Sequence, residues 1–371
     1  MLYVLTIAAF TSLSVALLLL RYLHLHLHLT GDPCNQGPQK FHIGRTPRVG
    51  GVPILVGMVA GMLVFVFREK LPWTAALAWL ALLPVFAAGL AEDLTKKVKG
   101  RWRLLASFVS AGLGCWQLGA VITRLDIPGI DTLLATVPWI AVLFTVVAVG
   151  GLCHALNLID GYNGLAGGVG VIILLSLGYV AFSVGDRLLL GVCLVTIGAT
   201  AGFLAWNFPR GLIFAGDGGA YLLGFMIAEI SVLLVIRNPQ VSPWFPCTLV
   251  MYPVWETVFT MYRRKVIRGR ATGLPDALHL HQMVFNRLVR WTVGAREVKN
   301  LRRRNAMTTP YLWGMGLLTV IPATLFWRYT LVLQFCSLSF IVFYVWLYQR
   351  LVRFRAPLWL MMHRSSDTNR E

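Results

Sequence analysis

The chain alternates between long apolar segments and short segments that are charged or rich in glycine and proline. Eleven of the apolar segments are close to the roughly 20 residues that a helix needs to cross a bilayer. A backbone in lipid must satisfy its own hydrogen bonds, so each segment is predicted to be a helix. They run over residues 2–23, 50–67, 73–91, 104–123, 137–156, 167–184, 188–206, 218–236, 242–262, 310–327 and 329–350.

Composition points the same way. The 371 residues are 57% hydrophobic and 13% charged, whereas a soluble domain carries about 25% charged residues. The mean hydropathy is +0.70. The predicted fold class is therefore all-α: a polytopic integral membrane protein of about 11 transmembrane helices, forming a single domain over residues 1–371.

Basic residues predict the orientation. If the amino terminus lies outside, 27 of the 33 Lys and Arg residues fall in cytoplasmic segments and six fall in outside loops. This distribution predicts a cytoplasmic carboxyl terminus. Most of the residues behind the net charge of +18 then lie in cytoplasmic loops, where they are expected to contact anionic membrane lipid. No nucleic-acid partner is expected. The six cysteines are scattered singly and indicate no disulfide framework or zinc site.

The largest cytoplasmic segment covers residues 263–309. Apolar residues such as Phe285 and Leu288 alternate there with arginines, which predicts an amphipathic helix on the inner leaflet. His279 and His281 are two residues apart, so they can face one ligand only in an extended or turning segment; a surface position is the alternative. Arginine forks suit phosphate oxygens. The arginines near the start of this segment are Arg263, Arg264, Arg268 and Arg270.

Acidic residues gather at the predicted cytoplasmic ends of separate segments. Asn157, Asp160 and Asn163 follow one another at a spacing of three, near one helical face, and glycines surround them. Asp217 opens a span between glycines, where a helix start already offers N–H groups to an anion. Oxygen ligands and substrate phosphates are the usual surroundings of Mg²⁺, so this pattern predicts a centre that binds Mg²⁺ (or Mn²⁺) and handles phosphates.

A second acidic group adds to this centre. Glu92 and Asp93 are adjacent and supply further oxygen ligands or a general base. Lys97 lies in the basic run that follows them. The alternative is a positive-inside loop with its counterions, and helix ends are also the least costly place for any single acid in a membrane protein.

These motifs resemble, in order, those of the polyprenyl-phosphate N-acetylhexosamine-1-phosphate transferases (glycosyltransferase family 4). The resemblance extends from residues 44–51, Gly-Arg-Thr-Pro-Arg-Val-Gly-Gly, to the histidine segment. It implies a bacterial inner-membrane enzyme with its active site facing the cytoplasm. Undecaprenyl phosphate would attack the β-phosphorus of a UDP-N-acetylhexosamine such as UDP-GlcNAc, release UMP and start an O-antigen-like surface polysaccharide. A homodimer is left open.

The resemblance also implies roles for individual residues. Asp93 would be the base, with Glu92 beside it, and Asp217 the metal ligand. Asn157 and Asp160 would contact nucleotide and metal. The histidine segment with its preceding arginines would hold the diphosphate and sugar through Arg263, Arg264, Arg268, Arg270, His279 and His281. Asn157, Asn163 and Lys97 would be further substrate contacts.

Four positions depart from the family pattern. The chain has Glu92 and Glu256 where the family commonly has Asp, and both keep a carboxylate. Asn163 replaces an Asp and so removes a charge. Gln282 replaces a His, which predicts a divergent sugar pocket and argues against the pentapeptide translocase branch.

A secondary transporter is the main alternative from another class. It would need acidic residues or broken helices near the middle of the bilayer. Glu229 alone has such a position, and a buried structural role also fits it. Aromatic prenyltransferases and CDP-alcohol phosphotransferases require acidic motifs with other spacings. Transport would leave the glycine-flanked aspartates unexplained.

Overall fold

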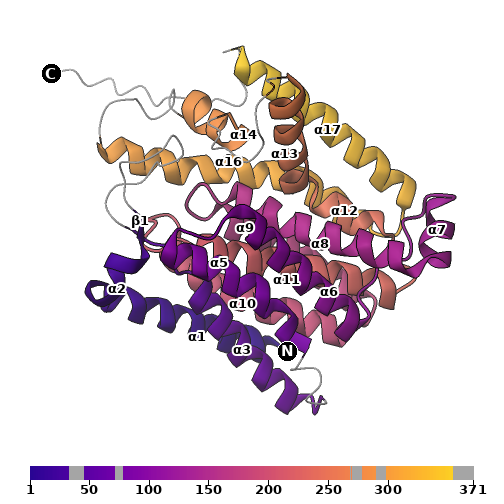
Figure 1. Cartoon of the computed structure of the whole chain (residues 1–371), viewed down its shortest axis with the longest axis horizontal. Helices are drawn as coiled ribbons and strands as arrows, with labels where there is room; N and C mark the ends of the chain where they lie inside the picture. The colour runs from indigo at the N-terminus through magenta and orange to yellow at the C-terminus, as the bar shows by residue number, and fades with distance from the viewer. Residues whose placement is uncertain (33–45, 72–77, 268, 270–277, 290–297, 354–371) are drawn as a thin grey trace.

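The structure is a computed structural model that describes residues 1–32, 46–71, 78–267, 269, 278–289 and 298–353. The described chain is almost wholly helical (Figure 1). Its first half contains α1 (Leu2–Arg21), α2 (Leu23–Thr30), β1 (Gly31–Asp32), β2 (Thr46–Pro47), α3 (Gly51–Arg68), η1 (Ala78–Leu82), α5 (Leu83–Thr95), α6 (Gly100–Leu118), α7 (Ile130–Thr136), α8 (Pro138–Ile159) and α9 (Leu165–Ser183).

The second half continues the helical pattern with two breaks into π-helix. It contains α10 (Arg187–Asn207), α11 (Gly216–Arg237), α12 (Trp244–Leu249), α13 (Met251–Tyr262), η2 (Arg263–Ile267), α14 (Leu280–Met283), η3 (Val284–Val289), α16 (Val298–Leu325) and α17 (Thr330–Val352).

Seven of these helices, α1, α3, α8, α9, α10, α11 and α17, are long and apolar enough to cross a membrane. This confirms the predicted class, an all-α membrane protein; the number of about 11 spans and the orientation stay predictions. The predicted span 242–262 is divided, since α12 ends at Leu249 and α13 begins at Met251. Pro253 fits this break because proline lacks the N–H that a continuous helix would need there.

Helix α11 lies at the centre of the molecule (Figure 1) and packs against α3, α5, α6, α8, α9 and α10. Its first turn, Gly216–Ala220, is built almost entirely from small residues, and nearly all of α11 is buried. A helix that is apolar on every side is expected in the interior of a bundle. The residues at its amino end are therefore positioned by several neighbouring helices at once.

The start of α3 is joined to the start of α11 by backbone hydrogen bonds. The N–H of Gly50 donates to the carbonyl of Phe214 at 2.8 Å, and the N–H of Gly51 donates to that of Ala215 at 3.0 Å. Just before them, β2 pairs with β1. These bonds fix the backbone on either side of Arg48, which follows β2 directly.

Helices α12, α13, α14, α16 and α17 form a second group beside the central bundle (Figure 1). Helix α13 contacts α8, and α16 contacts α9. In the predicted amphipathic segment, Phe285, Leu288 and Val289 of η3 are buried against the protein, and residues 290–297 lie outside the described part. This second group brings the histidine segment toward the end of α8.

We predict that Gly89→Ala lowers the melting temperature of the purified protein. A Cβ on Gly89 of α5 would lie 2.6 Å from the backbone nitrogen of Gly218, so α5 and α11 would have to separate. The matched control is Gly112→Ala in α6, where nothing lies within 4 Å of the new Cβ. Since alanine favours a helix over glycine by about 1 kcal/mol, this control should be neutral or stabilising. Equal melting temperatures for both variants would contradict the close packing.

Candidate functional site

The amino end of α11 is held by a carboxylate from a different helix. Asp93, near the end of α5, is 1% exposed. Its Oδ1 accepts the backbone N–H of Asp217 at 2.9 Å, and its Oδ2 accepts that of Gly218 at 2.9 Å. The first N–H groups of a helix have no partners within it and carry partial positive charge, so a carboxylate stabilises them. Both oxygens of Asp93 thus serve to fix the start of α11.

Asp217 gathers side chains from three other segments. Its Oδ1 accepts hydrogen bonds from Asn157 Nδ2 at 3.0 Å and from Arg48 Nη2 at 3.2 Å. Its Oδ2 pairs with Nη1 of Arg103, near the start of α6. Arg48 Nε also lies 3.5 Å from Asp93 Oδ1. The structure therefore brings together Asp93, Asn157 and Asp217, as predicted from their sequence positions, and adds two arginines.

Asp160 follows α8 directly and remains partly accessible. Within the described part of the chain, its carboxyl group makes no hydrogen bond or ion pair. Burial raises the pKa of Asp160 to about 7, and the Arg48 guanidinium opposes this rise. A cation beside such a carboxyl group would favour its ionised form. Asp160 is thus the acidic side chain of this centre that is open to a ligand.

The donor set at this centre fits a divalent cation that shares its ligands with a substrate. Asp160 and Asp217 offer carboxylate oxygens, the ligand type that Mg²⁺ prefers. Among the described residues, no group of three or more His, Cys, Asp or Glu side chains could hold a metal ion by itself. Mg²⁺ commonly takes one or two protein carboxylates and completes its shell with water and substrate phosphates. A magnesium site here therefore stays a prediction.

The histidine segment lies beside the end of α8. The rings of His279 and His281 stack, with centroids 5.1 Å apart and planes 6° from parallel. Both are buried. The backbone is extended at His279 (φ −65°, ψ 153°) and turns into α14 directly after it, so the two rings can lie on the same side. His281 packs edge-on against Tyr162, with ring centroids 5.8 Å apart. This places His281 next to the turn that contains Asp160.

The arginines of the predicted diphosphate group divide into two pairs. Arg263 and Arg264 are 4% and 7% exposed. The Arg263 guanidinium lies 5.6 Å from the ring centroid of Tyr348 on α17. Arg268 and Arg270 lie outside the described residues. Binding of a diphosphate by these four arginines stays a prediction.

Of three other predicted residues, Glu92 and Asn163 have structural contacts and Lys97 is exposed. Glu92 Oε2 accepts the backbone N–H of Val98 at 2.8 Å. The side chain of Lys97 is exposed in the same loop. Asn163 Nδ2 donates to the carbonyl of Pro209 at 3.1 Å, and Asn163 is 8% exposed. Asn163 therefore helps to fasten the turn after α8, and its replacement of an acid is compatible with that position.

Sequence reasoning missed Arg48 and Arg103 as members of the centre. Arg48 lies in the motif of residues 44–51, which carried the resemblance but received no chemical role. Arg103 ends a basic run for which a positive-inside loop is an alternative explanation. Its partner Asp217 is 114 residues away along the chain, so only the packing of α6 against α11 reveals the pair.

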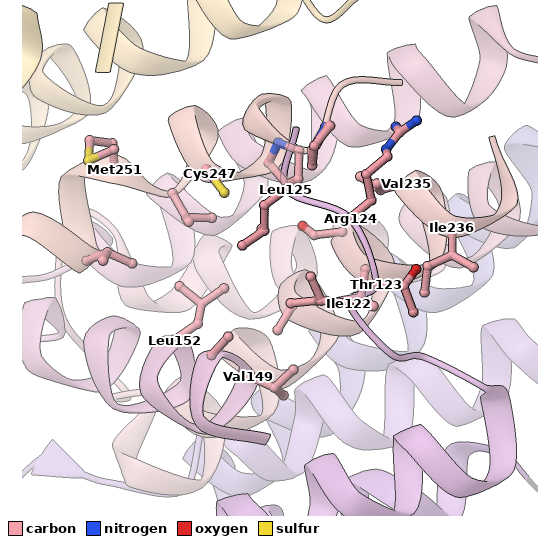
Figure 2. A pocket seen from close by; sticks show the side chains of 18 of the residues that line it. Ile122, Thr123, Arg124, Leu125, Val149, Leu152, Val235, Ile236, Cys247 and Met251 are labelled. Atoms are coloured by element: carbon pink, nitrogen blue, oxygen red, sulfur yellow. The ribbon is translucent and has the colours of Figure 1, made fainter. Parts of the chain in front are cut away.

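A separate apolar pocket of about 430 Å³ lies between α8, α11, α12 and α13 (Figure 2). Leu152, Val235 and Met251 are among its lining residues, and Arg124 is the one charged residue among those described. On α11 the lining begins at Ala228, about 16 Å along the helix from Asp217 at 1.5 Å per residue. The pocket suits hydrocarbon and is distinct from the polar centre.

Comparison with known proteins identifies the family. The family model described as Glycosyl transferase family 4 matches residues 75–235. A protein described as a probable undecaprenyl-phosphate N-acetylglucosaminyl 1-phosphate transferase, from Bacillus subtilis (strain 168), is 31% identical over 253 residues, which cover 67% of this chain and 68% of the relative.

Two further relatives have similar names. An undecaprenyl-phosphate alpha-N-acetylglucosaminyl 1-phosphate transferase from Thermotoga maritima is 27% identical over 68% of this chain and 72% of its own length. A decaprenyl-phosphate N-acetylglucosaminephosphotransferase from Mycobacterium leprae is 28% identical over 66% of this chain and 67% of its own length. The matched family region contains Asp93, Asn157, Asp160 and Asp217. The chain therefore belongs to glycosyl transferase family 4, as the resemblance of its acidic motifs predicts.

Proposed function

We propose that this protein transfers a sugar 1-phosphate from a UDP-sugar to undecaprenyl phosphate. The sugar is N-acetylglucosamine or a related N-acetylhexosamine. The observation that carries the proposal is the meeting of Asp217, Asn157 and two arginines at the start of α11, beside the open carboxyl of Asp160. The names of the relatives support a polyprenyl phosphate acceptor and an N-acetylglucosamine donor. The products would be UMP and a polyprenyl-diphospho-sugar.

The reaction exchanges one phosphorus–oxygen bond for another. An oxygen of the lipid phosphate attacks the β-phosphorus of the UDP-sugar, and the bond from that phosphorus to the bridging oxygen breaks. UMP leaves with the bridging oxygen and the electron pair. Such transfers depend mainly on positioning and on stabilising negative charge. The residues of the centre are of the types that this task requires.

The two arginines are assigned to the phosphates. Arg48 and Arg103 hold Asp217 now, and their guanidinium groups can share phosphate oxygens because they present several donors in a plane. Asp217 and Asp160 would hold Mg²⁺ or Mn²⁺, which would neutralise charge on the diphosphate. In the substrate complex, the arginines would then be paired with phosphate oxygens, and the carboxylates of Asp160 and Asp217 with the cation.

Asp93 is assigned to hold α11 in place of acting as a base. The second pKa of a phosphate monoester is about 6, so the attacking oxygen is already ionised at neutral pH and does not need a base to remove a proton. Release of Asp93 for proton transfer would also break its bonds to the N–H groups of Asp217 and Gly218. Its effect on turnover would therefore pass through the position of Asp217.

The location of the centre supports a cytoplasmic-facing site in a bacterial inner membrane. It includes the end of α5, which adjoins the basic run of residues 96–103, and this run is predicted to be cytoplasmic. The product would begin a surface polysaccharide of the O-antigen type. Transport is not favoured, because the relatives named above are all described as transferases.

We expect the purified protein to release UMP from UDP-GlcNAc only when both undecaprenyl phosphate and Mg²⁺ are present. The Mg²⁺ requirement follows from the two carboxylates that face the substrate site. A panel with UDP-GalNAc and UDP-glucose, assayed with and without EDTA, measures the donor preference. UMP release without the lipid phosphate, or at an unchanged rate in EDTA, would contradict the proposal.

Asp217→Asn should reduce turnover at saturating Mg²⁺ by about 10²–10³-fold or more, the range for removing one electrostatic group from a reacting centre. The melting temperature should change little, because the backbone N–H of residue 217 still donates to Asp93. The control is Asp131→Asn near the start of α7, which keeps an acceptor for the N–H of Leu125 and should leave turnover unchanged. Full activity of Asp217→Asn would remove this residue from the centre.

Arg103→Ala should raise the KM for the UDP-sugar by about 10-fold, as expected for losing a hydrogen bond to a charged group. Arg101→Ala is the matched control, since Arg101 lies two residues earlier, is exposed, and packs over Trp102. Steady-state assays at varied UDP-GlcNAc measure both. Equal effects of the two substitutions would show that Arg103 acts only as part of a basic loop.

A further inference from the structure

Glu256 of α13 is a carboxyl group buried inside the second helix group. It is 0% exposed. Its Oε1 lies 3.3 Å from His281 Nδ1 and 4.0 Å from His279 Nδ1, and it accepts the backbone N–H of Leu280 at 2.7 Å. A buried carboxylate is costly unless it is paired, so these contacts are what makes its position tolerable.

The two nitrogens of His281 face opposite surroundings. Nδ1 faces Glu256. Nε2 lies 3.3 Å from the point where a Cβ of Gly161 would be, so it faces the turn that carries Asp160. Because the partner of one ring nitrogen determines the protonation and direction of the other, a carboxylate at Nδ1 favours a proton there. Nε2 is then presented to the side of the phosphate centre.

The backbone around His281 is fixed independently. Gln282 Oε1 accepts the N–H of His279 at 3.2 Å, and the His279 side chain accepts in return from the first turn of α14. Thr260 of α13 lies 3.2 Å from His279 Nδ1. With the backbone held by these contacts, the remaining freedom of His281 is the rotation of its ring, and Glu256 is the charged group that restrains it.

We propose that Glu256 is a positioning residue that orients His281, so that Nε2 contacts a phosphate oxygen of the substrate bound at the Asp160–Gly161 turn. This inference rests on the proposed function, because it needs a phosphate-bearing substrate in that place. A structural role alone, in which Glu256 serves only to accept the N–H of Leu280, predicts a different response to substitution.

The test compares Glu256→Gln, His281→Asn and the double variant in the full-length purified protein, assayed for UMP release. Glutamine keeps the size of Glu256 and an acceptor for Leu280 but loses the charge. His281→Asn should lower kcat by about 10²-fold, as expected for losing a group that acts at the reacting phosphate. Glu256→Gln should lower kcat by about 10-fold, with an unchanged KM for UDP-GlcNAc.

The double variant decides between the two roles. If Glu256 acts through His281, the double variant is no slower than His281→Asn alone. Multiplication of the two losses would overturn the proposal. Glu256→Asp keeps the charge and should recover part of the rate even if Glu256→Gln folds poorly; an equal loss in Glu256→Asp and Glu256→Gln would also overturn it.

Two controls separate this proposal from the proposed function. Glu229→Gln removes another buried carboxyl group, on α11 and outside the centre, and should leave kcat unchanged. The wild-type protein must first release UMP from UDP-GlcNAc with undecaprenyl phosphate. An inactive wild type contradicts the proposed function itself, whereas an active wild type with an active His281→Asn variant contradicts only the positioning role.

Discussion

The bond between the Asp93 carboxylate and the first N–H groups of α11 is the interaction on which the centre depends. It joins α5 to α11 at the backbone of Asp217 and Gly218, in the first turn of α11. The helices can approach this closely because Gly89 and Gly51 present no side chain to the start of α11. Asp217 is therefore placed by backbone geometry that several helices share, and a change in any of them would move its carboxylate.

Charge balance explains why the same side chains can serve both the folded protein and the reaction. Asp93, Asp160 and Asp217 face the guanidinium groups of Arg48 and Arg103. Without a ligand, the two arginines compensate the carboxylates of Asp93 and Asp217, and Asp160 has no ion-pair partner among the described residues. A diphosphate would compete for the arginines, and a divalent cation would then compensate the carboxylates. Substrate and cation would therefore bind together, because the diphosphate draws the arginines away from the carboxylates and the cation then compensates the charge of those carboxylates.

The sequence predicted the helical membrane class and the gathering of Asn157, Asp160 and Asp217, because hydropathy and glycine-flanked acids are local signals. It did not predict that Asp93 would cap α11, since this depends on how α5 packs against a helix more than 100 residues later. The break between α12 and α13 was also missed, because the residues around it are mostly apolar and only the nearby prolines mark the interruption. The role of Arg103 was not predicted either, because it lies in a basic run and finds its partner Asp217 only through the packing of α6 against α11.

The proposed mechanism depends on one divalent cation being held between the start of α11 and the end of α8. Anomalous X-ray scattering from crystals of the protein grown with Mn²⁺ and a UDP-sugar tests this most directly. We expect one peak in contact with the carboxylates of Asp160 and Asp217, next to the diphosphate. A manganese peak on other residues, or none beside a well-ordered diphosphate, would contradict it.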